Sequence, residues 1–308
     1  MTIDLLVLLE RFSGETRLSV AKDSVTPLNA LEMLAKDENS AVRLGVAQHP
    51  SISQELLTRL AEDESGVIRN CVASRSERPD VLSRLSQDDD PAVRAEIASN
   101  PATSEETLLS LTGDACEHTR YRLVHRNPDL SLALLEKLAH DEAPLIRSMI
   151  AKRRETPSEI LSELAKDEDR NVRAAAASNK NISPGVLAEL AEDEDFFVRI
   201  YVAGNSRTPP GVLERLVQDD SAAVHMAAIC NASIPAEVLL RLASDSHELF
   251  TLLRATTIGS VVSREVLEKL LLHEEEWVRQ AAEQRIAEYP ARRALNVESM
   301  PGSRSRRG

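Results

Sequence analysis

The chain has 308 residues, of which 42% are hydrophobic, 28% charged and only 3% aromatic, and its formal net charge is −13. The hydrophobic content excludes a disordered chain, and the negative charge excludes a general attraction to nucleic acid or anionic membranes. The scarcity of aromatic residues favours many small helical layers over one deep core.

The chain begins with MTIDLLVLLERF, whose apolar run of five residues is bracketed by Asp4 and Glu10. A secretory signal peptide needs a basic start and a longer apolar run, and no run in the chain approaches the length of a membrane span. We therefore expect a cytoplasmic protein without membrane contact. Residues 1–16 are predicted to form a half-repeat that caps the N-terminal end of the fold through four leucines: Leu5, Leu6, Leu8 and Leu9.

One residue pattern recurs between residues 17 and 279, usually every 26 residues and once after a longer step of 29. Its fixed point is a basic residue that mostly follows valine or isoleucine and mostly precedes an alanine by four positions: Arg17, Arg43, Arg69, Arg94, Arg120, Arg147, Arg173, Arg199, His225, Arg254 and Arg279. Self-similarity at a fixed period is typical of a repeat architecture. The pattern predicts about eleven copies of one unit of two short helices.

The first helix of each unit is expected to start after a capping residue four positions before the arginine: Asn39, Ser65, Asp90, Asp169, Asp195 or Ser221. Pro91 and Pro144 stand near its first position, where a missing N–H costs little. The helix should end near an asparagine that tolerates the left-handed backbone of a helix exit: Asn100, Asn179, Asn205 or Asn231. Helices of two or three turns are short enough for some to be wound as 3₁₀ segments.

The second helix has its own start signal, a hydroxyl cap followed by proline: Thr26-Pro27, Thr156-Pro157, Ser183-Pro184 and Thr208-Pro209. Leucines three residues apart then mark its buried face, as in Leu57 and Leu60, Leu161 and Leu164, Leu187 and Leu190, and Leu213 and Leu216. Helices this short are not stable alone, so each unit must bury its apolar face against the next unit. The fold predicted is an all-α solenoid.

An aspartate stands six residues before nearly every arginine of the repeat. Because arginine offers five donors in a fixed fork, we predict that each one binds the aspartate of its own unit together with a carbonyl or carboxylate of the neighbouring layer. The residues of this predicted structural ladder are Asp37, Arg43, Asp63, Arg69, Asp88, Arg94, Asp114, Arg120, Asp141, Arg147, Asp167, Arg173, Asp193 and Arg199. An array of free arginines that binds a polyanion is the less favoured alternative, since a half-buried guanidinium without its carboxylate is costly.

The unit at residues 167–191 resembles the leucine-rich repeat variant family. Residues 167–179, DEDRNVRAAAASN, are similar to the family pattern D-x-x-x-x-V-R-x-A-V-A-x-N, and residues 183–191, SPGVLAELA, to its proline-started leucine helix. The likeness runs from about Arg17 to Arg279. It implies a right-handed superhelix of paired helices, with the option that one helix of each pair is 3₁₀, and it extends to HEAT-type repeats, whose Asp and Arg form a ladder at similar spacing.

The resemblance does not supply an activity. The function of the family is largely unassigned, and some members carry an N-terminal cysteine cluster for an iron–sulfur centre. This chain has no cysteine before Cys71, and Cys71, Cys116 and Cys230 form no C-x-x-C motif. The sequence also lacks a glycine-rich phosphate loop, H-E-x-x-H and G-x-S-x-G, and its histidines have no metal-ligand spacing. We expect no enzyme activity, no metal and no cofactor.

The charges are expected to lie on two edges of the solenoid. Corners that hold the aspartates are acidic, as in Asp88-Asp89-Asp90 and Asp167-Glu168-Asp169. The opposite corners, between the first and second helices, form a predicted basic strip over the middle repeats: Arg75, Arg78, Arg126, Lys152, Arg153, Arg154, Lys180 and Arg207. These residues are the predicted binding site, and the alternative for them is charge balance against the acidic edge.

The function favoured by this pattern is a protein–protein interaction scaffold whose unidentified partner protein lies across the strip or the adjoining surface. The alternative is nucleic-acid binding through phosphates, which the acidic edge and the lack of interleaved aromatic residues disfavour. Head-to-tail self-association is a third hypothesis, although the acidic surface favours a monomer.

The unit pattern weakens toward the C-terminus, where His225 replaces the arginine and His273 stands in the place of an aspartate. We predict one solenoid domain over residues 1–288, with irregular repeats over residues 246–288, because terminal repeats face water on one side. Residues 289–308 are predicted to be a flexible basic tail, which either docks on acidic surface or only adds solubility.

Overall fold

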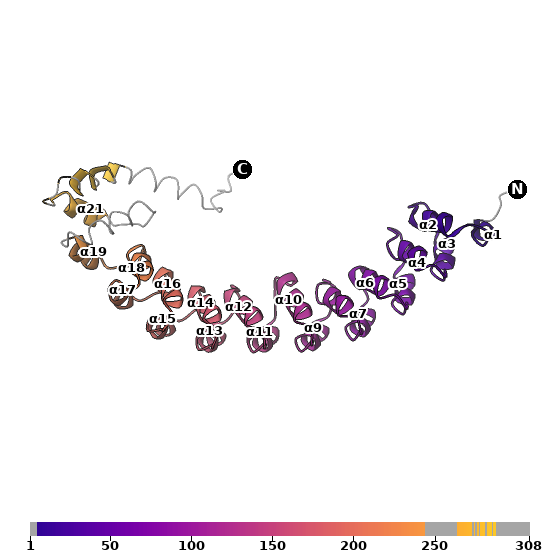
Figure 1. Cartoon of the computed structure of the whole chain (residues 1–308), viewed down its shortest axis with the longest axis horizontal. Helices are drawn as coiled ribbons and strands as arrows, with labels where there is room; N and C mark the ends of the chain where they lie inside the picture. The colour runs from indigo at the N-terminus through magenta and orange to yellow at the C-terminus, as the bar shows by residue number, and fades with distance from the viewer. Residues whose placement is uncertain are drawn as a thin grey trace, which may run out of the picture. The chain divides into compact units, whose positions relative to one another are not determined.

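The computed structural model describes residues 5–243 and 264–272, together with residues 274, 276, 278–280, 282–284 and 286–287 (Figure 1). All regular structure in these residues is α-helical, and they contain no strand. The chain divides into two compact units, Met1–Ile150 and Ala151–Gly308. The prediction of a single domain over residues 1–288 stays a prediction.

The helices of the first unit are α1 Leu5–Leu9, α2 Gly14–Lys22, α3 Leu28–Leu34, α4 Ser40–Ala47, α5 Gln54–Leu60, α6 Gly66–Arg75, α7 Pro79–Leu85, α8 Pro91–Ile97, α9 Glu105–Leu111, α10 Glu117–Arg126 and α11 Leu132–Ala139. The boundary between the units falls inside α12 Pro144–Lys152. The second unit continues with α13 Ser158–Leu164, α14 Arg170–Ser178, α15 Pro184–Leu190, α16 Phe196–Gly204, α17 Pro210–Leu216, α18 Ala222–Ile229, α19 Ala236–Ala243 and α21 Arg264–Leu270.

The two helices of each repeat form two layers within each unit. Even-numbered helices from α2 to α18 are the first helices, and odd-numbered helices from α3 to α19 are the second helices (Figure 1). A first helix packs on the first helix of the next repeat, as α6 does on α8 and α14 on α16, and also on its own second helix. This stacking of helix pairs is an α-solenoid, so the predicted all-α solenoid is confirmed, whereas its right-handed sense stays a prediction.

The core lies between the layers and is built from the residues that the repeat pattern marks. The paired leucines of the second helices are buried, as Leu57 and Leu60 show with 1% and 3% exposure. The alanines four positions after the arginine are also buried, because the first helices approach one another closely there. Gly45 shows how close: a Cβ atom added to it would lie 3.1 Å from the Cβ of Ala21 in the preceding repeat.

Both helices of each repeat are α-helical in the described residues, so the 3₁₀ option is not realised there. In α5, for example, the Leu57 N–H donates to the Ser53 carbonyl and the Ala61 N–H to the Leu57 carbonyl. Bonds that span four residues define the α-helix, and the Ser53 hydroxyl stabilises its start by accepting from the Leu56 N–H.

The predicted caps of the first helices are largely confirmed. Side-chain oxygens accept a first-turn N–H at four of the six predicted positions: Asn39, Asp90, Asp169 and Asp195. Ser65 and Ser221 occupy the cap position of α6 and α18 without a side-chain bond. Pro91 and Pro144 are the first residues of their helices, as predicted.

The threonine caps predicted for the second helices are wrong. Thr26 and Thr208 lie one residue too early, and Pro27 and Pro209 take the cap position. The two threonine hydroxyls instead donate to the backbone carbonyls of Val20 and Val202, which lie in the last turn of the preceding first helix. Ser183, one position later in the repeat, does cap its helix by accepting from the Val186 N–H.

The end of the chain is described only in part. Most of the predicted irregular repeats over residues 246–288, and the predicted tail 289–308 with Arg304, Arg306 and Arg307, lie outside the described residues. In the part of the chain that the structure covers, no helix has the length and apolar content to span a membrane.

Candidate functional site

The arginine ladder joins each repeat to the next. Arg43 donates through Nε and Nη2 to the Asp63 carboxylate, at 2.7 and 2.9 Å, and through Nη1 to the Asp37 carbonyl at 2.8 Å. The carboxylate therefore belongs to the following repeat, and the aspartate of the arginine's own repeat supplies only its backbone carbonyl. The predicted contact to a carboxylate of the neighbouring layer is observed, and the prediction differs only in that the arginine's own aspartate contributes its backbone carbonyl.

The same bonds recur in both units. The carboxylate rungs are Arg17–Asp37, Arg43–Asp63, Arg69–Asp88, Arg94–Asp114 and Arg120–Asp141 in the first unit, and Arg173–Asp193 and Arg199–Asp219 in the second. Arg147 donates to the Asp141 carbonyl at 2.8 Å, and the Asp167 carboxylate accepts from the Asp169 N–H at 2.9 Å. His225, which replaces an arginine, bonds the Val217 carbonyl through Nδ1.

Hydrogen bonding keeps the ladder charged. Burial raises the pKa of the Asp63 carboxyl, but hydrogen bonds from Arg43 and from the Ser65 N–H lower it by more, so its pKa lies below the ordinary value. The bond to Asp63 raises the pKa of the Arg43 guanidinium above its ordinary value. These arginines are held by their rungs, so the ladder is not a surface for binding a polyanion.

A second ladder, which sequence reasoning missed, lies at the end of the first helices. The Asn205 side-chain amide donates to the carbonyls of Ala177 and Asn179 in the preceding repeat, at 2.6 and 3.0 Å. Asn100, Asn179 and Asn231 make equivalent pairs of bonds. The predicted left-handed exit is wrong at Asn179 and Asn205, whose backbones are extended, with φ and ψ of −73° and 139° and of −77° and 127°. The sequence signal for this second ladder was the 26-residue spacing of Asn179, Asn205 and Asn231.

In two repeats of the first unit another residue takes the asparagine position. His49 is buried, and its Nε2 lies 2.9 Å from the Asp23 carbonyl while its Nδ1 accepts from the Ser51 N–H at 3.1 Å. Arg75 donates to the His49 carbonyl at 2.9 Å. Arg75, a predicted binding residue, therefore holds two repeats together.

The other predicted binding residues differ in how they are held. Arg78 donates two bonds to Asp80, at 3.2 and 3.1 Å, and Arg126 is exposed at the end of α10. In the second unit Arg153 is half-buried, with Nε 3.5 Å from a Glu155 carboxylate oxygen.

The remaining predicted cations of the second unit lie at the end of α12 and in the loops that join first to second helices. Lys152, Arg154 and Lys180 are exposed and form no ion pair with any residue that the structure describes. Arg207 is exposed in the next loop, where its Nη1 donates to the Lys180 carbonyl at 3.1 Å. We call these four residues the cationic row: Lys152, Arg154, Lys180 and Arg207.

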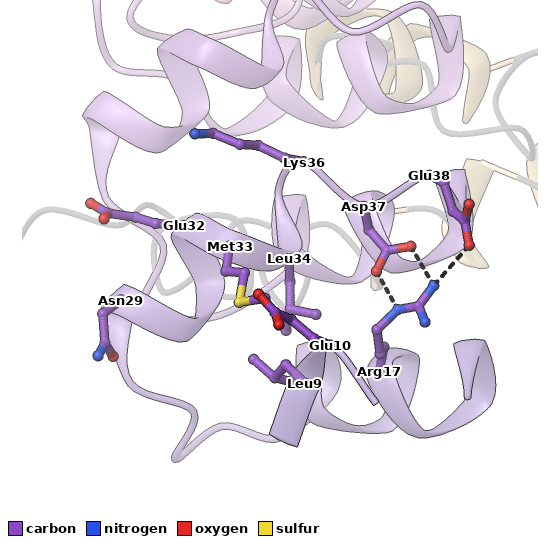
Figure 2. A pocket seen from close by; sticks show the side chains of 10 residues that line it. All are labelled: Leu9, Glu10, Arg17, Asn29, Glu32, Met33, Leu34, Lys36, Asp37 and Glu38. Atoms are coloured by element: carbon purple, nitrogen blue, oxygen red, sulfur yellow. Dashed lines mark hydrogen bonds and ion pairs between the residues drawn. The ribbon is translucent and has the colours of Figure 1, made fainter. Parts of the chain in front are cut away.

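A cavity of about 700 Å³ lies at the N-terminal end of the first unit, between α1, α2 and α3. Figure 2 shows the Arg17 rung at its side, with Arg17 bound to Asp37 and Glu38, and Leu9, Met33 and Leu34 at its apolar part. Arg17 is already paired with Asp37, so the ladder supplies no free cation that could bind an anion in this cavity.

The residues described by the structure contain no group of three histidine, cysteine, aspartate or glutamate side chains arranged to hold a metal ion. No disulfide links Cys71, Cys116 and Cys230. Burial raises the pKa of the Cys71 thiol, which keeps it protonated and poorly nucleophilic.

Comparison with known proteins agrees with this geometry. The family model described as leucine rich repeat variant matches residues 170–195 and 196–221, two consecutive repeats. A solved leucine-rich repeat variant with a novel repetitive structural motif is similar over 74% of this chain and 95% of its own, with 23% identity and a TM-score of 0.57. That likeness shows the fold.

Two further solved structures match with low TM-scores, which carry no weight. An engineered protein from a structural genomics consortium matches over 92% of this chain and 97% of its own, with 17% identity and a TM-score of 0.28. A computationally designed armadillo repeat protein for modular peptide recognition matches over 88% and 98%, with 16% identity and a TM-score of 0.13. The comparison with curated proteins gave no match.

Proposed function

We propose that this helical repeat protein, which contains leucine rich repeat variant units, is a protein-binding scaffold that acts without catalysis, and that its cationic row takes an acidic segment of a partner protein. The observation that carries the proposal is a set of exposed cations that form no ion pair with any described residue: Lys152 at the end of α12, and Arg154 and Lys180 in the loops after α12 and α14. Some cations on the second helices are paired instead: Arg84 lies 2.7 Å from Glu62, and Arg215 lies 3.4 Å from Glu192.

The spacing of the row suits an extended chain. Packed helices lie about 8–10 Å apart, so equivalent residues of neighbouring repeats are separated by roughly that distance. An extended peptide advances roughly 3.3 Å per residue. A segment with an acidic residue at every third position therefore meets one cationic loop after another.

The structure favours a protein partner over nucleic acid. The ladder arginines are held by their rungs, so they are not available to bind phosphates. The chain's net charge of −13 repels a long polyanion beyond the row.

The test is a fluorescence anisotropy titration of the full chain with a labelled twelve-residue peptide that has glutamate at every third position. We expect the triple variant Lys152→Glu, Arg154→Glu, Lys180→Glu to raise Kd by about tenfold or more, since each change replaces attraction by repulsion. A control with the same change in charge at exposed lysines elsewhere, Lys36→Glu, Lys137→Glu, Lys166→Glu, should stay within about threefold of the parent.

A labelled single-stranded DNA of twelve nucleotides is titrated in parallel. Tighter binding of the DNA than of the peptide, lost on the row variant, would overturn the proposal in favour of nucleic acid. Equal losses on the row variant and on the control would show that only net charge matters and would remove the row from the function.

A further inference from the structure

The aromatic side chains that the structure describes gather on one helix. α16 carries Phe196, Phe197 and Tyr201, whereas Phe12 and Tyr121 are the other aromatic residues in the described part of the chain. The rings of Phe197 and Tyr201 meet edge to face, with centroids 5.1 Å apart. They lie four residues apart and so share one face of the helix.

Packing of the core does not explain this cluster. The buried residues of α16 are Val198, Val202 and Ala203, whereas Phe196 and Tyr201 keep 49% and 39% of their surface exposed. Isolated exposed apolar residues are ordinary, but grouped aromatic residues mark sites where interfaces gain most of their binding energy. The Arg170 guanidinium, on the preceding first helix, lies 5.9 Å from the centre of the Phe197 ring and adds a cation–π contact.

The surface beside Tyr201 has open space that no side chain fills. Gly204 lies three residues on, on the same face, and a Cβ atom added to it would meet no atom within 4 Å. Gly204 is the last residue of α16, where no packing contact requires a glycine. Its effect is to leave room next to the tyrosine ring.

Charge changes sign along α16. Glu194 and Asp195 lie at its start, and Arg207 follows its last residue by three positions, next to Lys180. A bound acidic segment must therefore direct its carboxylates toward the end of α16 and away from its start. The residue that precedes or follows those carboxylates then lies over Tyr201.

We infer that Phe197, Tyr201 and the space over Gly204 form an anchor site for an apolar side chain of the acidic partner segment. The inference rests on the proposed function and adds a requirement to it, namely one aliphatic residue beside the carboxylates. The aromatic faces supply the apolar contact, and Lys180 and Arg207 supply the charge that fixes the direction of the segment.

The test is a double-mutant cycle between the chain and the peptide. Two labelled acidic peptides differ only at one central position, which is leucine or serine. On the parent chain the leucine peptide should bind about fivefold tighter, and on Tyr201→Ser that advantage should fall below about twofold. Gly204→Gln, which fills the open space without touching the core, should remove the advantage as well.

Tyr121→Ser in the first unit is the matched control and should leave the advantage of leucine unchanged. If leucine keeps its advantage on both α16 variants, the anchor site is overturned while the affinity for acidic segments stands. If neither peptide binds the parent chain, the proposed function fails and the anchor site fails with it. Thermal unfolding followed by circular dichroism verifies that each variant is folded.

Discussion

Each arginine that forms a carboxylate rung is held by acceptors from two different repeats. In Arg120, which is 3% exposed, Nε and Nη2 donate to Asp141 at 2.7 and 3.0 Å, and Nη1 donates to the Asp114 carbonyl at 2.6 Å. A planar guanidinium cannot satisfy both sides if one layer rotates or slides, because its donors are fixed in one plane. The rung therefore sets the register of adjacent layers.

Removing one carboxylate should show the strength of a rung. We expect Asp63→Ala to lower the free energy of unfolding by about 3–5 kcal/mol, because it leaves the Arg43 guanidinium buried without its carboxylate. Glu64→Ala removes an exposed carboxylate that lies 3.0 Å from the same arginine, and it should cost no more than about 1 kcal/mol. Urea unfolding followed by circular dichroism measures the free energy of unfolding of both variants. Similar losses for the two would contradict the explanation that burial makes the Asp63 rung stronger.

Acid should weaken the rungs that contain Asp37, Asp63, Asp88 and Asp114 together. The pKa values of Asp37, Asp63, Asp88 and Asp114 lie below the ordinary value in the folded chain. Their stabilisation is therefore fully present above the unfolded pKa of about 3.9 and is lost as the pH falls through the lower folded values. Tm values at pH 7, 5 and 3.5 should be similar for the first two and clearly lower for the third. A Tm that falls mainly between pH 7 and 5 would point to histidines instead.

The sequence identified the residues of the ladder but not how they pair. In a pattern with a period of 26, a position six residues before an arginine and one twenty residues after it are equivalent. Only the folded chain shows that Asp63, not Asp37, gives Arg43 its carboxylate. The asparagine ladder was missed for a related reason, since an asparagine at a helix end fits both a backbone role and a side-chain role.

At the scale of the helix, cap chemistry predicted most of the starts and erred by one residue at the Thr-Pro pairs. Thr103-Ser104 separates the two roles, because Thr103 donates to the Ile97 carbonyl at 2.8 Å while Ser104 caps α9 by accepting from the Thr107 N–H. Where proline replaces that serine, the threonine keeps only its bond to the preceding helix. A sequence that contains only the Thr-Pro pair cannot distinguish these two uses of a hydroxyl.

The closeness of the layers can be tested with two glycines in equivalent helices. Gly45→Val should destabilise the chain by about 1–3 kcal/mol, because the added atoms overlap with Ala21 and Leu18 of the preceding repeat. Gly204→Val places the same atoms in open space and should change stability by less than about 0.5 kcal/mol. Urea unfolding compares the two, and equal effects would show that helix propensity, not layer packing, determines the cost.

For the whole molecule, every tie between repeats is short in sequence. The rung Arg69–Asp88 joins residues 19 apart, and the Asn127 amide reaches Ala98, 29 residues before it. Stability in such a fold is approximately a sum over repeats and their nearest-neighbour interfaces. The pattern of 26 residues reveals this architecture in the sequence, whereas it does not reveal which surface cations lack a partner, because that depends on side-chain conformations in three dimensions.

Deleting one whole repeat should leave a folded protein. Removal of residues 170–195 joins Asp169 to Phe196, so Asp169 takes the capping position of Asp195 and the next rungs keep their register. We expect a cooperative thermal transition with Tm lowered by a few degrees. Deleting only residues 183–195 removes a second helix, places two first helices in sequence and should abolish cooperative unfolding of the second unit. Circular dichroism melts of both variants make the comparison.

The rung between adjacent layers has a mechanical consequence. If the two ends of the chain are pulled apart, the rungs bear the tension in series. The weakest rung therefore breaks first, and the other rungs break after it, one at a time. Each rupture frees one repeat of 26 residues, which adds roughly 80 Å of extended chain. The force–extension curve of a single molecule stretched between optical traps should be a regular sawtooth. The protein would then act as a tether that lengthens in small steps before it is fully unfolded.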